Sequence, residues 1–318
     1  MIDVNSYQYL LIFFASALSA FLVTPVFRKL ARKTRILDYP GGRKLQDAPV
    51  AYLGGLAVAT PITLGSIFFM LTNLENGLKI QVFFGLILPS LIIAFTGLLD
   101  DLYQLLPLPR FIAQTTVGII TSVFLNLSEN GISLFVNPWL NGLITTFWVV
   151  TIINAINFLD NMDGLASTIS IISASTIFIL SFINGQFLVA ILSLAISASC
   201  LGFLFWNRRP ASIYLGDAGA LYLGFLLAAM SIRVDVNSQP QWLRVLVPVL
   251  IFAIPVIDIT QVVITRLLKR KSPFDGGRDH LSHLLINQGY SQNVVLMILV
   301  FTSCIFSVIG IYLALEFK

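Results

Sequence analysis

Apolar runs of about 20 residues follow one another along almost the whole sequence, and they constrain the fold more than any other feature. A run of this length can cross the core of a bilayer as a helix and is too long for a barrel strand. Irregular backbone is not tolerated against lipid, so the runs should be helical. We predict an all-α integral membrane protein, one domain over residues 1–318, with about ten transmembrane helices. The predicted spans are 7–27, 51–71, 80–99, 111–127, 138–156, 165–183, 187–206, 217–232, 243–265 and 292–314.

The composition supports this class of protein. Hydrophobic residues make up 57% of the chain and charged residues 11%, whereas a soluble domain averages about 25% charged residues. Asp3 precedes the first span and basic residues follow it, which is the reverse of a signal peptide, so this span should remain in the mature protein. Cys200 and Cys304 lie inside apolar runs, and we interpret both as packing residues.

The basic residues predict the topology. Fifteen of the nineteen Lys and Arg residues fall in the loops after the first, third, fifth, seventh and ninth spans. The positive-inside rule makes these loops cytoplasmic and leaves both termini external at the cell membrane. The net charge of +4 then reflects topology and does not indicate nucleic-acid binding.

Most of the acidic residues and both histidines fall on the same predicted cytoplasmic side. Carboxylates beside many Lys and Arg residues are typical of a site for a divalent metal and a phosphate-bearing substrate. The alternative is that the basic residues only set the topology and the acids only cap helices or form polar turns. The residues concerned are Asp100, Asp101, Asp160, Asp163, Asp217, Asp275, Asp279, His280 and His283.

The segment 154–164 is unusually polar for the end of a span. If it is helical, Asn154, Asn157, Asp160 and Asp163, spaced three apart, share one face. Such a row of oxygen ligands would suit Mg²⁺, with Mn²⁺ as a substitute, and would leave coordination sites for water and phosphate.

Three further features point to the same side of the membrane. Asp258 lies roughly 12 Å inside the ninth span at 1.5 Å per residue, and such an acid either serves a functional site or bonds to backbone freed by Pro255. Arg278 can clamp a phosphate. Zinc is not expected at His280 and His283, because no cysteine accompanies them.

Four motifs together resemble the polyprenyl-phosphate N-acetylhexosamine-1-phosphate transferase family, in the family's order and over nearly the whole chain. They are the segments 97–101, 154–164, 214–219 and 279–283. The resemblance implies that Asp217 is the principal Mg²⁺ ligand and that Asp100 and Asp101 position or deprotonate a lipid phosphate. It also implies nucleotide and metal binding by Asp160 and Asp163. The remaining implied contacts are Tyr214 under uracil, where an interfacial aromatic is an equal alternative, and Lys44 against phosphate.

The resemblance implies transfer of an N-acetylhexosamine 1-phosphate from a UDP-sugar to undecaprenyl phosphate, with release of UMP. This step starts a cell-envelope glycan lipid intermediate. Three positions depart from the family: Gln46 and Ser282 replace histidines, and Ala220 replaces a serine. The missing adjacent histidines weigh against the phospho-N-acetylmuramoyl-pentapeptide transferase branch and favour the branch that uses simpler UDP-N-acetylhexosamines, such as UDP-N-acetylglucosamine.

Other classes of protein make different demands on the sequence. A secondary transporter would place polar groups at the midplane within internal repeats, and only Asp258 is deep. A CDP-alcohol phosphatidyltransferase would continue the Asp163-Gly164 pair with further spaced aspartates, which this chain lacks. A non-catalytic scaffold, a homodimer, the carrier length and the identity of the sugar stay open.

Overall fold

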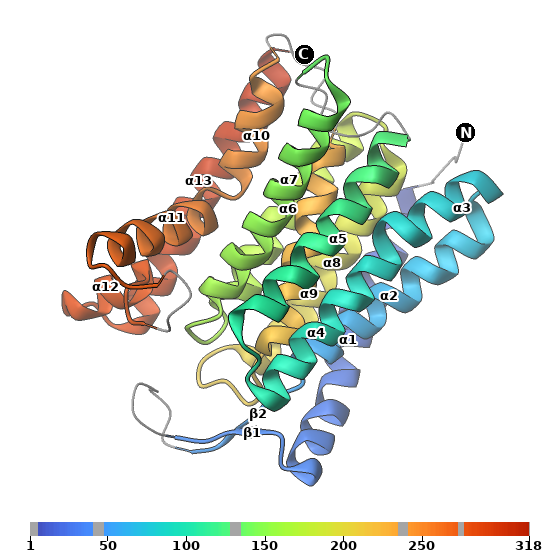
Figure 1. The fold of residues 1–318 in the computed structure, drawn as a ribbon. Coiled ribbons are helices and arrows are strands. Elements are labelled where there is room, and N and C mark those ends of the chain that lie inside the picture. Colours follow the sequence, from blue (N-terminus) through green and yellow to red (C-terminus); the bar gives the residue numbers. More distant parts are fainter. Residues whose placement is uncertain (1–5, 41–47, 128–134, 235–240, 273–276, 318) are drawn as a thin grey trace.

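The computed structural model describes residues 6–40, 48–127, 135–234, 241–272 and 277–317. These residues form a helical bundle, and the prediction of an all-α membrane protein is confirmed (Figure 1). The first half of the chain supplies α1 Ser6–Thr34, α2 Gly54–Asn73, α3 Asn76–Val82, a π-helical turn η1 Phe83–Ile87, α4 Leu88–Tyr103, α5 Pro107–Leu127 and α6 Pro138–Leu159. The second half supplies α7 Leu165–Ile183, α8 Phe187–Asn207, α9 Gly216–Arg233, α10 Leu243–Ile251, α11 Ala253–Leu268, α12 Leu281–Asn287 and α13 Gln292–Glu316.

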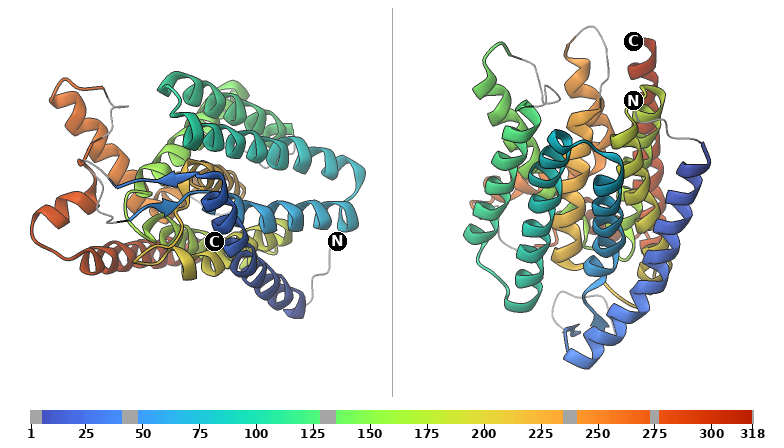
Figure 2. Two further views of the ribbon diagram at one scale, coloured as in Figure 1. Left: turned by 90° about the horizontal axis from the view of Figure 1, so that it is seen from below. Right: turned by 90° about the vertical axis from the view of Figure 1, so that its right-hand side faces the viewer.

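Each of the ten predicted spans is helical in the structure. Among the described residues, eight helices are long and apolar enough to cross a membrane, and the bent pair α10–α11 makes a ninth. The helix outside this set is α9, which has a charged residue near each end, Asp217 and Arg233. It runs through the middle of the bundle in Figures 1 and 2, and most of its side chains are buried. Thus α9 is a core helix that contacts other helices in place of lipid.

Both described ends of the chain lie at one end of the bundle. The start of α1 and the end of α13 are at the top in Figure 1 and in the right-hand view of Figure 2. The short strands β1, Leu37–Asp38, and β2, Val50–Ala51, lie at the opposite end. Termini at the same end require an even number of crossings. The nine candidate spans of the described residues, together with α9, give ten.

The predicted span 243–265 is broken in the structure. α10 and α11 meet at Phe252 with a bend of 84°. Pro255 has no N–H to offer the carbonyl four residues earlier, that of Ile251. The Ser173 hydroxyl of α7 donates to this Ile251 carbonyl instead, at 3.2 Å. The bend is therefore accommodated without an unpaired carbonyl inside the membrane.

In the third span, too, a hydroxyl of a neighbouring helix pairs with a carbonyl that a proline leaves free. Pro89 lies in the first turn of α4 and cannot donate to the Gly85 carbonyl, and the chain forms the π-helical turn η1 at this point. The Thr121 hydroxyl of α5 donates to that carbonyl at 3.0 Å. A neighbouring helix again satisfies the backbone that a proline frees.

The strands β1 and β2 pair antiparallel and hold the segment that leads into α9. Ala51 forms a parallel bridge with Ile213, and the Tyr214 N–H donates to the Ala51 carbonyl at 2.8 Å. Gly54 then donates to the Tyr214 carbonyl at 3.0 Å. These bonds fix the N-terminus of α9 against the end of the bundle.

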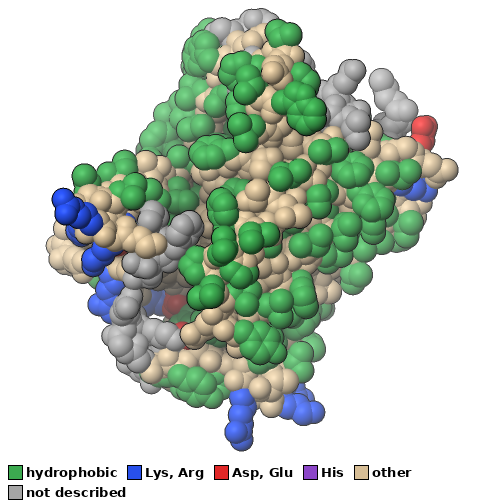
Figure 3. Space-filling model, viewed as in Figure 1, with side chains coloured by type: hydrophobic (Ala, Val, Ile, Leu, Met, Phe, Trp, Pro, Cys, Tyr) green, Lys and Arg blue, Asp and Glu red, His purple; other side chains and the backbone are tan. Residues whose placement is uncertain are grey.

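The surface divides into an apolar belt and a basic end. In Figure 3, hydrophobic side chains cover the flank of the bundle, and most visible Lys and Arg side chains gather at its lower end and lower left. Acidic atoms are visible in a hollow at the lower left, beside basic ones. Polar chemistry is therefore concentrated at the end that carries β1 and β2.

Candidate active site

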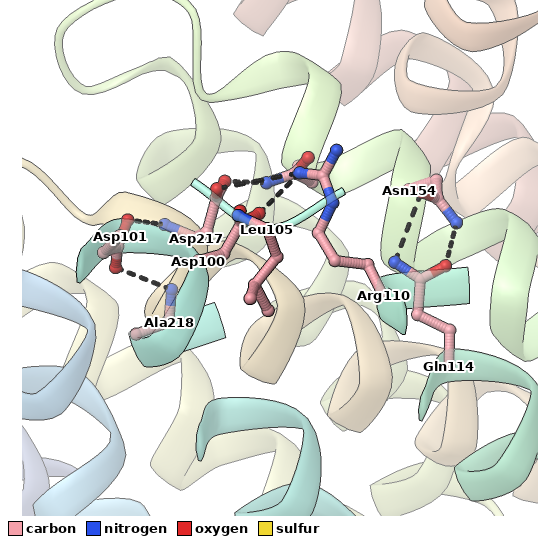
Figure 4. Close-up of polar contacts among 9 residues, drawn as sticks. Asp100, Asp101, Leu105, Arg110, Gln114, Asn154, Asp217 and Ala218 are labelled. Atoms are coloured by element: carbon pink, nitrogen blue, oxygen red, sulfur yellow. Dashed lines mark hydrogen bonds and ion pairs between the residues drawn. The ribbon is translucent and has the colours of Figure 1, made fainter. Parts of the chain in front are cut away.

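Four carboxylates from three parts of the chain meet where α4 ends and α9 begins. We call Asp100, Asp101, Asp160 and Asp217 the acidic cluster; part of it is drawn in Figure 4. α4 and α9 touch backbone to backbone here. A Cβ added to Gly97 would lie 2.4 Å from the Asp217 carbonyl oxygen. The glycine of the 97–101 motif thus allows its two aspartates to reach α9.

Asp101 caps α9. Its Oδ1 accepts a hydrogen bond from the Asp217 N–H at 2.8 Å, and its Oδ2 accepts one from the Ala218 N–H at 3.1 Å (Figure 4). A carboxylate at a helix N-terminus satisfies otherwise unpaired N–H groups and complements the helix dipole. The geometry therefore makes Asp101 a residue that positions Asp217.

Asp100 is buried and paired with Arg110. Its Oδ1 accepts from the Leu105 N–H at 2.7 Å, and its Oδ2 accepts from Arg110 Nη1 at 2.5 Å. The same Arg110 nitrogen lies 3.9 Å from Asp217 Oδ2. Sequence reasoning used Arg110 only as a topology signal and missed it as a site residue. Its position one helix beyond the 97–101 motif was the available clue.

Asp217 is partly exposed and lies among polar and charged neighbours. Asn157 Nδ2 donates to Asp217 Oδ1, while the nearest cation to Oδ2 is Arg110, and the side chain is 32% exposed. The predicted row of ligands over 154–164 is not continuous. α6 ends at Leu159, and Asn154 turns toward α5 and exchanges hydrogen bonds with Gln114 at 2.6 and 3.3 Å. Only Asn157 of the two asparagines joins the acidic cluster.

The two aspartates after α6 have different surroundings. Burial and the nearby negative charge of Asp217 raise the pKa of Asp160 to about 7. Asp163 Oδ2 accepts from the Ala211 N–H at 3.0 Å and so holds the loop that leads into α9. The N-cap of α7 is Gly164, in the left-handed region at φ +74°, and no side chain caps that helix. The alternative that Asp163 only caps α7 is therefore wrong.

Tyr214 lies at the edge of this region. Its ring is 6.1 Å from that of Tyr52, edge to face, and burial together with nearby aspartates raises the pKa of its hydroxyl. The predicted phosphate contact Lys44 lies outside the described residues, as do Gln46 and Asp275.

A second group of polar residues lies on α11 and the start of α12. We call Asp258, Arg266, Asp279 and His280 the histidine segment. Asp258 is fully buried; its Oδ2 lies 2.9 Å from His280 Nδ1, and its Oδ1 accepts from the Leu281 N–H at 2.7 Å. Asp258 therefore orients His280, and its described hydrogen bonds go to residues 280 and 281 and not to backbone freed by Pro255.

Charge pairing continues along the same segment. Arg266 Nε donates to Asp279 Oδ2 at 2.9 Å, which holds the pKa of Asp279 below its usual range. The His283 ring lies 6.0 Å from that of His280, and burial lowers the pKa of His283. Arg278 is exposed on the same turn.

The loop after α6 connects the two groups. The Phe158 ring packs edge to face on His280 at 5.4 Å, and Ser282 Oγ donates to Asn161 Oδ1 at 2.6 Å. Ser282, which departs from the family pattern, thus has a structural partner. Asp160 lies between these two contacts in the chain, so the acidic cluster and the histidine segment face one region.

The carboxylates of the acidic cluster are candidate ligands for Mg²⁺. Within the described part of the chain, no group of three or more His, Cys, Asp or Glu side chains is arranged to hold a metal ion. Mg²⁺, however, is usually held by one or two carboxylates, with water and substrate phosphates completing the octahedron. Asp217, which is partly exposed, and Asp160 beside it supply such a pair. The residues present therefore fit a metal that is completed by substrate.

Comparison with known proteins identifies relatives over the whole chain. Residues 83–235 match the model of glycosyl transferase family 4. The chain is 31% identical to the probable undecaprenyl-phosphate N-acetylglucosaminyl 1-phosphate transferase of Bacillus subtilis, over 98% of this chain and 87% of that protein. It is 26% identical to the undecaprenyl-phosphate alpha-N-acetylglucosaminyl 1-phosphate transferase of Escherichia coli K12, over 92% and 82%.

A third relative comes from a mycobacterium. The decaprenyl-phosphate N-acetylglucosaminephosphotransferase of Mycobacterium leprae is 29% identical over 89% of this chain and 78% of its own length. The matched segment 83–235 contains the acidic cluster, and the full-length similarity includes the histidine segment. The chain therefore belongs to glycosyl transferase family 4.

Proposed function

We propose that the protein transfers N-acetylglucosamine 1-phosphate from UDP-N-acetylglucosamine to undecaprenyl phosphate and releases UMP. The names of the relatives give the transferred group and the polyprenyl-phosphate acceptor. The observation that carries the proposal is Asp217, a partly exposed carboxylate beside Arg110 and Asp160 at one end of a membrane bundle. A soluble nucleotide and a lipid phosphate can both reach such a place.

The chemistry exchanges one phosphoanhydride bond for another. An oxygen of the lipid phosphate attacks the β-phosphorus of the UDP-sugar, and the bond from that phosphorus to the bridging oxygen breaks. UMP leaves with the bridging oxygen, and the sugar stays on the β-phosphate. Because the bond formed resembles the bond broken, we expect the reaction to be readily reversible.

Charge neutralisation is the main demand of this reaction, because both reactants are anions. Asp217 and Asp160 would hold Mg²⁺, which supplies Lewis-acid neutralisation of the phosphates when bound. Arg110, held by Asp100, adds a fixed positive charge beside Asp217. The carboxylate oxygens of Asp100 and Asp101 accept hydrogen bonds from other protein groups. We therefore propose that these two residues position Arg110 and Asp217 and do not abstract a proton. A phosphate dianion needs no base.

His280 contributes from the other side. Asp258 engages its Nδ1 and leaves Nε2 as the other ring nitrogen, which in the imidazolium form can donate to a phosphate. His283, in α12, and Arg278, just before that helix, extend the anion-binding groups. Asn157 steers Asp217, and Tyr214 offers a ring for the uracil.

The orientation follows from the basic loops. The end of the bundle with the acidic cluster carries the Lys- and Arg-rich loops, so we place it in the cytoplasm. All of the proposed site residues come from one chain, so the proposal does not require a homodimer. A reporter fused after Lys318 should appear outside the cell.

The deciding experiment uses purified protein in detergent with Mg²⁺, undecaprenyl phosphate and labelled UDP-N-acetylglucosamine. We expect equal amounts of UMP and lipid-linked pyrophosphoryl sugar, and added UMP should return label to the UDP-sugar. EDTA should stop both directions. UDP-N-acetylmuramoyl-pentapeptide, offered in parallel, tests the other branch. If the protein binds UMP but transfers nothing from any UDP-N-acetylhexosamine, the enzyme assignment fails and the scaffold reading gains.

A further inference from the structure

A basic pocket lies on the flank of the bundle formed by α1 and α8, apart from the residues assigned to the candidate active site. It has a volume of about 420 Å³. Its lining is made by the lower part of α1, the end of α8 and the loop that follows. The lining residues are Arg28, Phe205, Trp206, Arg208, Arg209, Pro210 and Ser212. Segments 180 residues apart in the sequence therefore build one pocket.

The lining of the pocket is positively charged. Arg28, Arg208 and Arg209 contribute three guanidinium groups, and no carboxylate is among the described residues that line it; Asp163 contacts the same loop through the Ala211 N–H. The Nε of Arg28 is buried and has no hydrogen-bond partner among the described residues. A buried, unsatisfied donor costs free energy unless a ligand completes it. Guanidinium groups pair with phosphate through two parallel hydrogen bonds, so phosphate is the chemistry that this pocket fits.

Aromatic side chains fix the pocket wall. The Arg208 guanidinium lies 4.8 Å from the centre of the Phe205 ring, and Trp206 Nε1 donates to the Phe21 carbonyl of α1 at 3.0 Å. The Ser212 hydroxyl donates to the Trp206 carbonyl at 2.9 Å. These contacts hold the loop against α1 and α8, so the backbone that carries the three arginines is fixed by packing.

An apolar track continues from the pocket along the outside of α8. Phe205 is 52% exposed and Leu201, one turn earlier, is 45% exposed. Both helices that bear the pocket are long and apolar enough to cross a membrane. A soluble anion has no use for such a track, whereas the acyl chains of a membrane lipid would follow it.

We infer that this pocket binds the phosphodiester headgroup of an anionic phospholipid of the surrounding membrane, with the arginines on the phosphate and the acyl chains along α8. The inference does not depend on the proposed transfer reaction. Basic pockets at the membrane interface recognise anionic headgroups in this way.

Native mass spectrometry of the purified full-length protein tests the inference. The probes are phosphatidylglycerol and phosphatidylcholine with identical acyl chains. Wild type should retain phosphatidylglycerol selectively. The triple variant Arg28→Gln/Arg208→Gln/Arg209→Gln should bind it weaker by on the order of tenfold or more, as expected for three interfacial cations.

A matched control removes the same charge from the same end of the molecule. Lys29, Arg32 and Lys33 are exposed on α1 and do not line the pocket. The variant Lys29→Gln/Arg32→Gln/Lys33→Gln should retain phosphatidylglycerol as wild type does. Equal losses in both triple variants would mean diffuse surface attraction and would overturn the inference.

Two further arms separate other sources of phosphate. Displacement of phosphatidylglycerol by millimolar inorganic phosphate, or by an equimolar amount of undecaprenyl phosphate, would overturn the inference in favour of a free anion or the acceptor. If the triple variant fails to fold, the double variant Arg208→Gln/Arg209→Gln serves, because both side chains are exposed. It should keep the elution volume and melting temperature of wild type and lose phosphatidylglycerol selectivity.

Discussion

The acidic cluster and the histidine segment both place carboxylates at the same end of the bundle, yet they balance charge in opposite ways. In the histidine segment each described carboxylate has its own basic partner, His280 for Asp258 and Arg266 for Asp279. The acidic cluster has four carboxylates, and the described ion pairs within it involve a single cation, Arg110, which contacts Asp100 and Asp217. In the histidine segment the carboxylates are matched by basic partners, and in the acidic cluster they outnumber the described cations.

This difference distinguishes a region that fixes its own side chains from a region that is arranged to bind a cation. Paired groups fix one another, so the histidine segment keeps the His280 ring in a defined orientation without any ligand. Carboxylates that repel one another are relieved when a cation binds. The acidic cluster therefore reaches charge balance only when positive charge arrives, which suits a metal-dependent phosphate site. The following predictions test this contrast, in order of decreasing effect.

The largest effect is expected from Asp217→Asn. The substitution preserves shape and removes the charge of the proposed metal ligand, so UMP release should fall by on the order of a thousandfold, as expected when Lewis-acid catalysis is lost. The thermal unfolding temperature should stay near that of wild type. If turnover in Asp217→Asn keeps the Mg²⁺ dependence of wild type, then the metal belongs to other carboxylates.

Arg110→Gln should come next. It removes the cation shared by Asp100 and Asp217, and kcat/KM should drop by on the order of a hundredfold, the size found when one preorganised charge-stabilising donor is lost. Arg110→Lys keeps the charge without the planar fork and should recover part of the loss. Initial rates against UDP-N-acetylglucosamine measure both variants. Normal kcat/KM in Arg110→Gln would contradict a role in the reaction.

Asp258→Asn tests the histidine segment. Loss of the carboxylate should leave the His280 ring free to rotate and lower kcat by roughly ten- to a hundredfold, as for other carboxylates that orient a histidine. Because Asp258 acts through His280, the double variant Asp258→Asn/His280→Ala should be no slower than His280→Ala alone. Independent, additive losses would assign Asp258 a purely structural role.

The smallest effects are expected in stability against pH, and they should have opposite signs in the two regions. The pKa of Asp160 is raised from 3.8 to about 7, so without metal the folded state loses stability as pH rises from about 4 to 7. In EDTA, Asp160→Asn should therefore melt above wild type at pH 8, and the difference should shrink toward pH 4.

Asp279 supplies the other sign. Arg266 lowers its pKa, so its contribution is present above the ordinary value near 3.8 and is lost as pH falls through the folded value. Asp279→Asn should melt below wild type at pH 7, and the two should converge in acid. Melting curves of both variants over one pH series provide the comparison, and slopes of the same sign would contradict the contrast.

The apolar runs were enough to predict the helices, because burial in lipid imposes helical backbone locally. The break at Phe252 could not be predicted in the same way. A proline frees a carbonyl in any helix, but the 84° bend also depends on Ser173, a partner on another helix. Local sequence indicated the weak point, and tertiary packing set its shape.

The candidate site shows the same division. The four motifs predicted which segments would meet, and Asp217, Asp160 and Asn157 do lie together. Individual roles depended on geometry across long separations. Asp101 contacts the backbone at residues 217 and 218, and Asp258 contacts a histidine 22 residues away. No local pattern distinguishes a carboxylate that caps a helix from one that awaits a ligand.

The central position of α9 has a consequence for biosynthesis. Its principal neighbours are α4, α6 and α2, with α7 and α8 also in contact, and all of them precede α9 in the chain. A ribosome therefore delivers α9 after the helices that surround it. Glycines allow α9 to approach the backbones of α2 and α6 closely. A Cβ on Gly55 would lie 2.1 Å from the Gly219 nitrogen, and one on Gly224 would lie 2.7 Å from Ile153 Cα. Asp217 enters with this late helix, so a nascent chain stalled before α9 carries Asp101 and Arg110 but still lacks the proposed metal ligand.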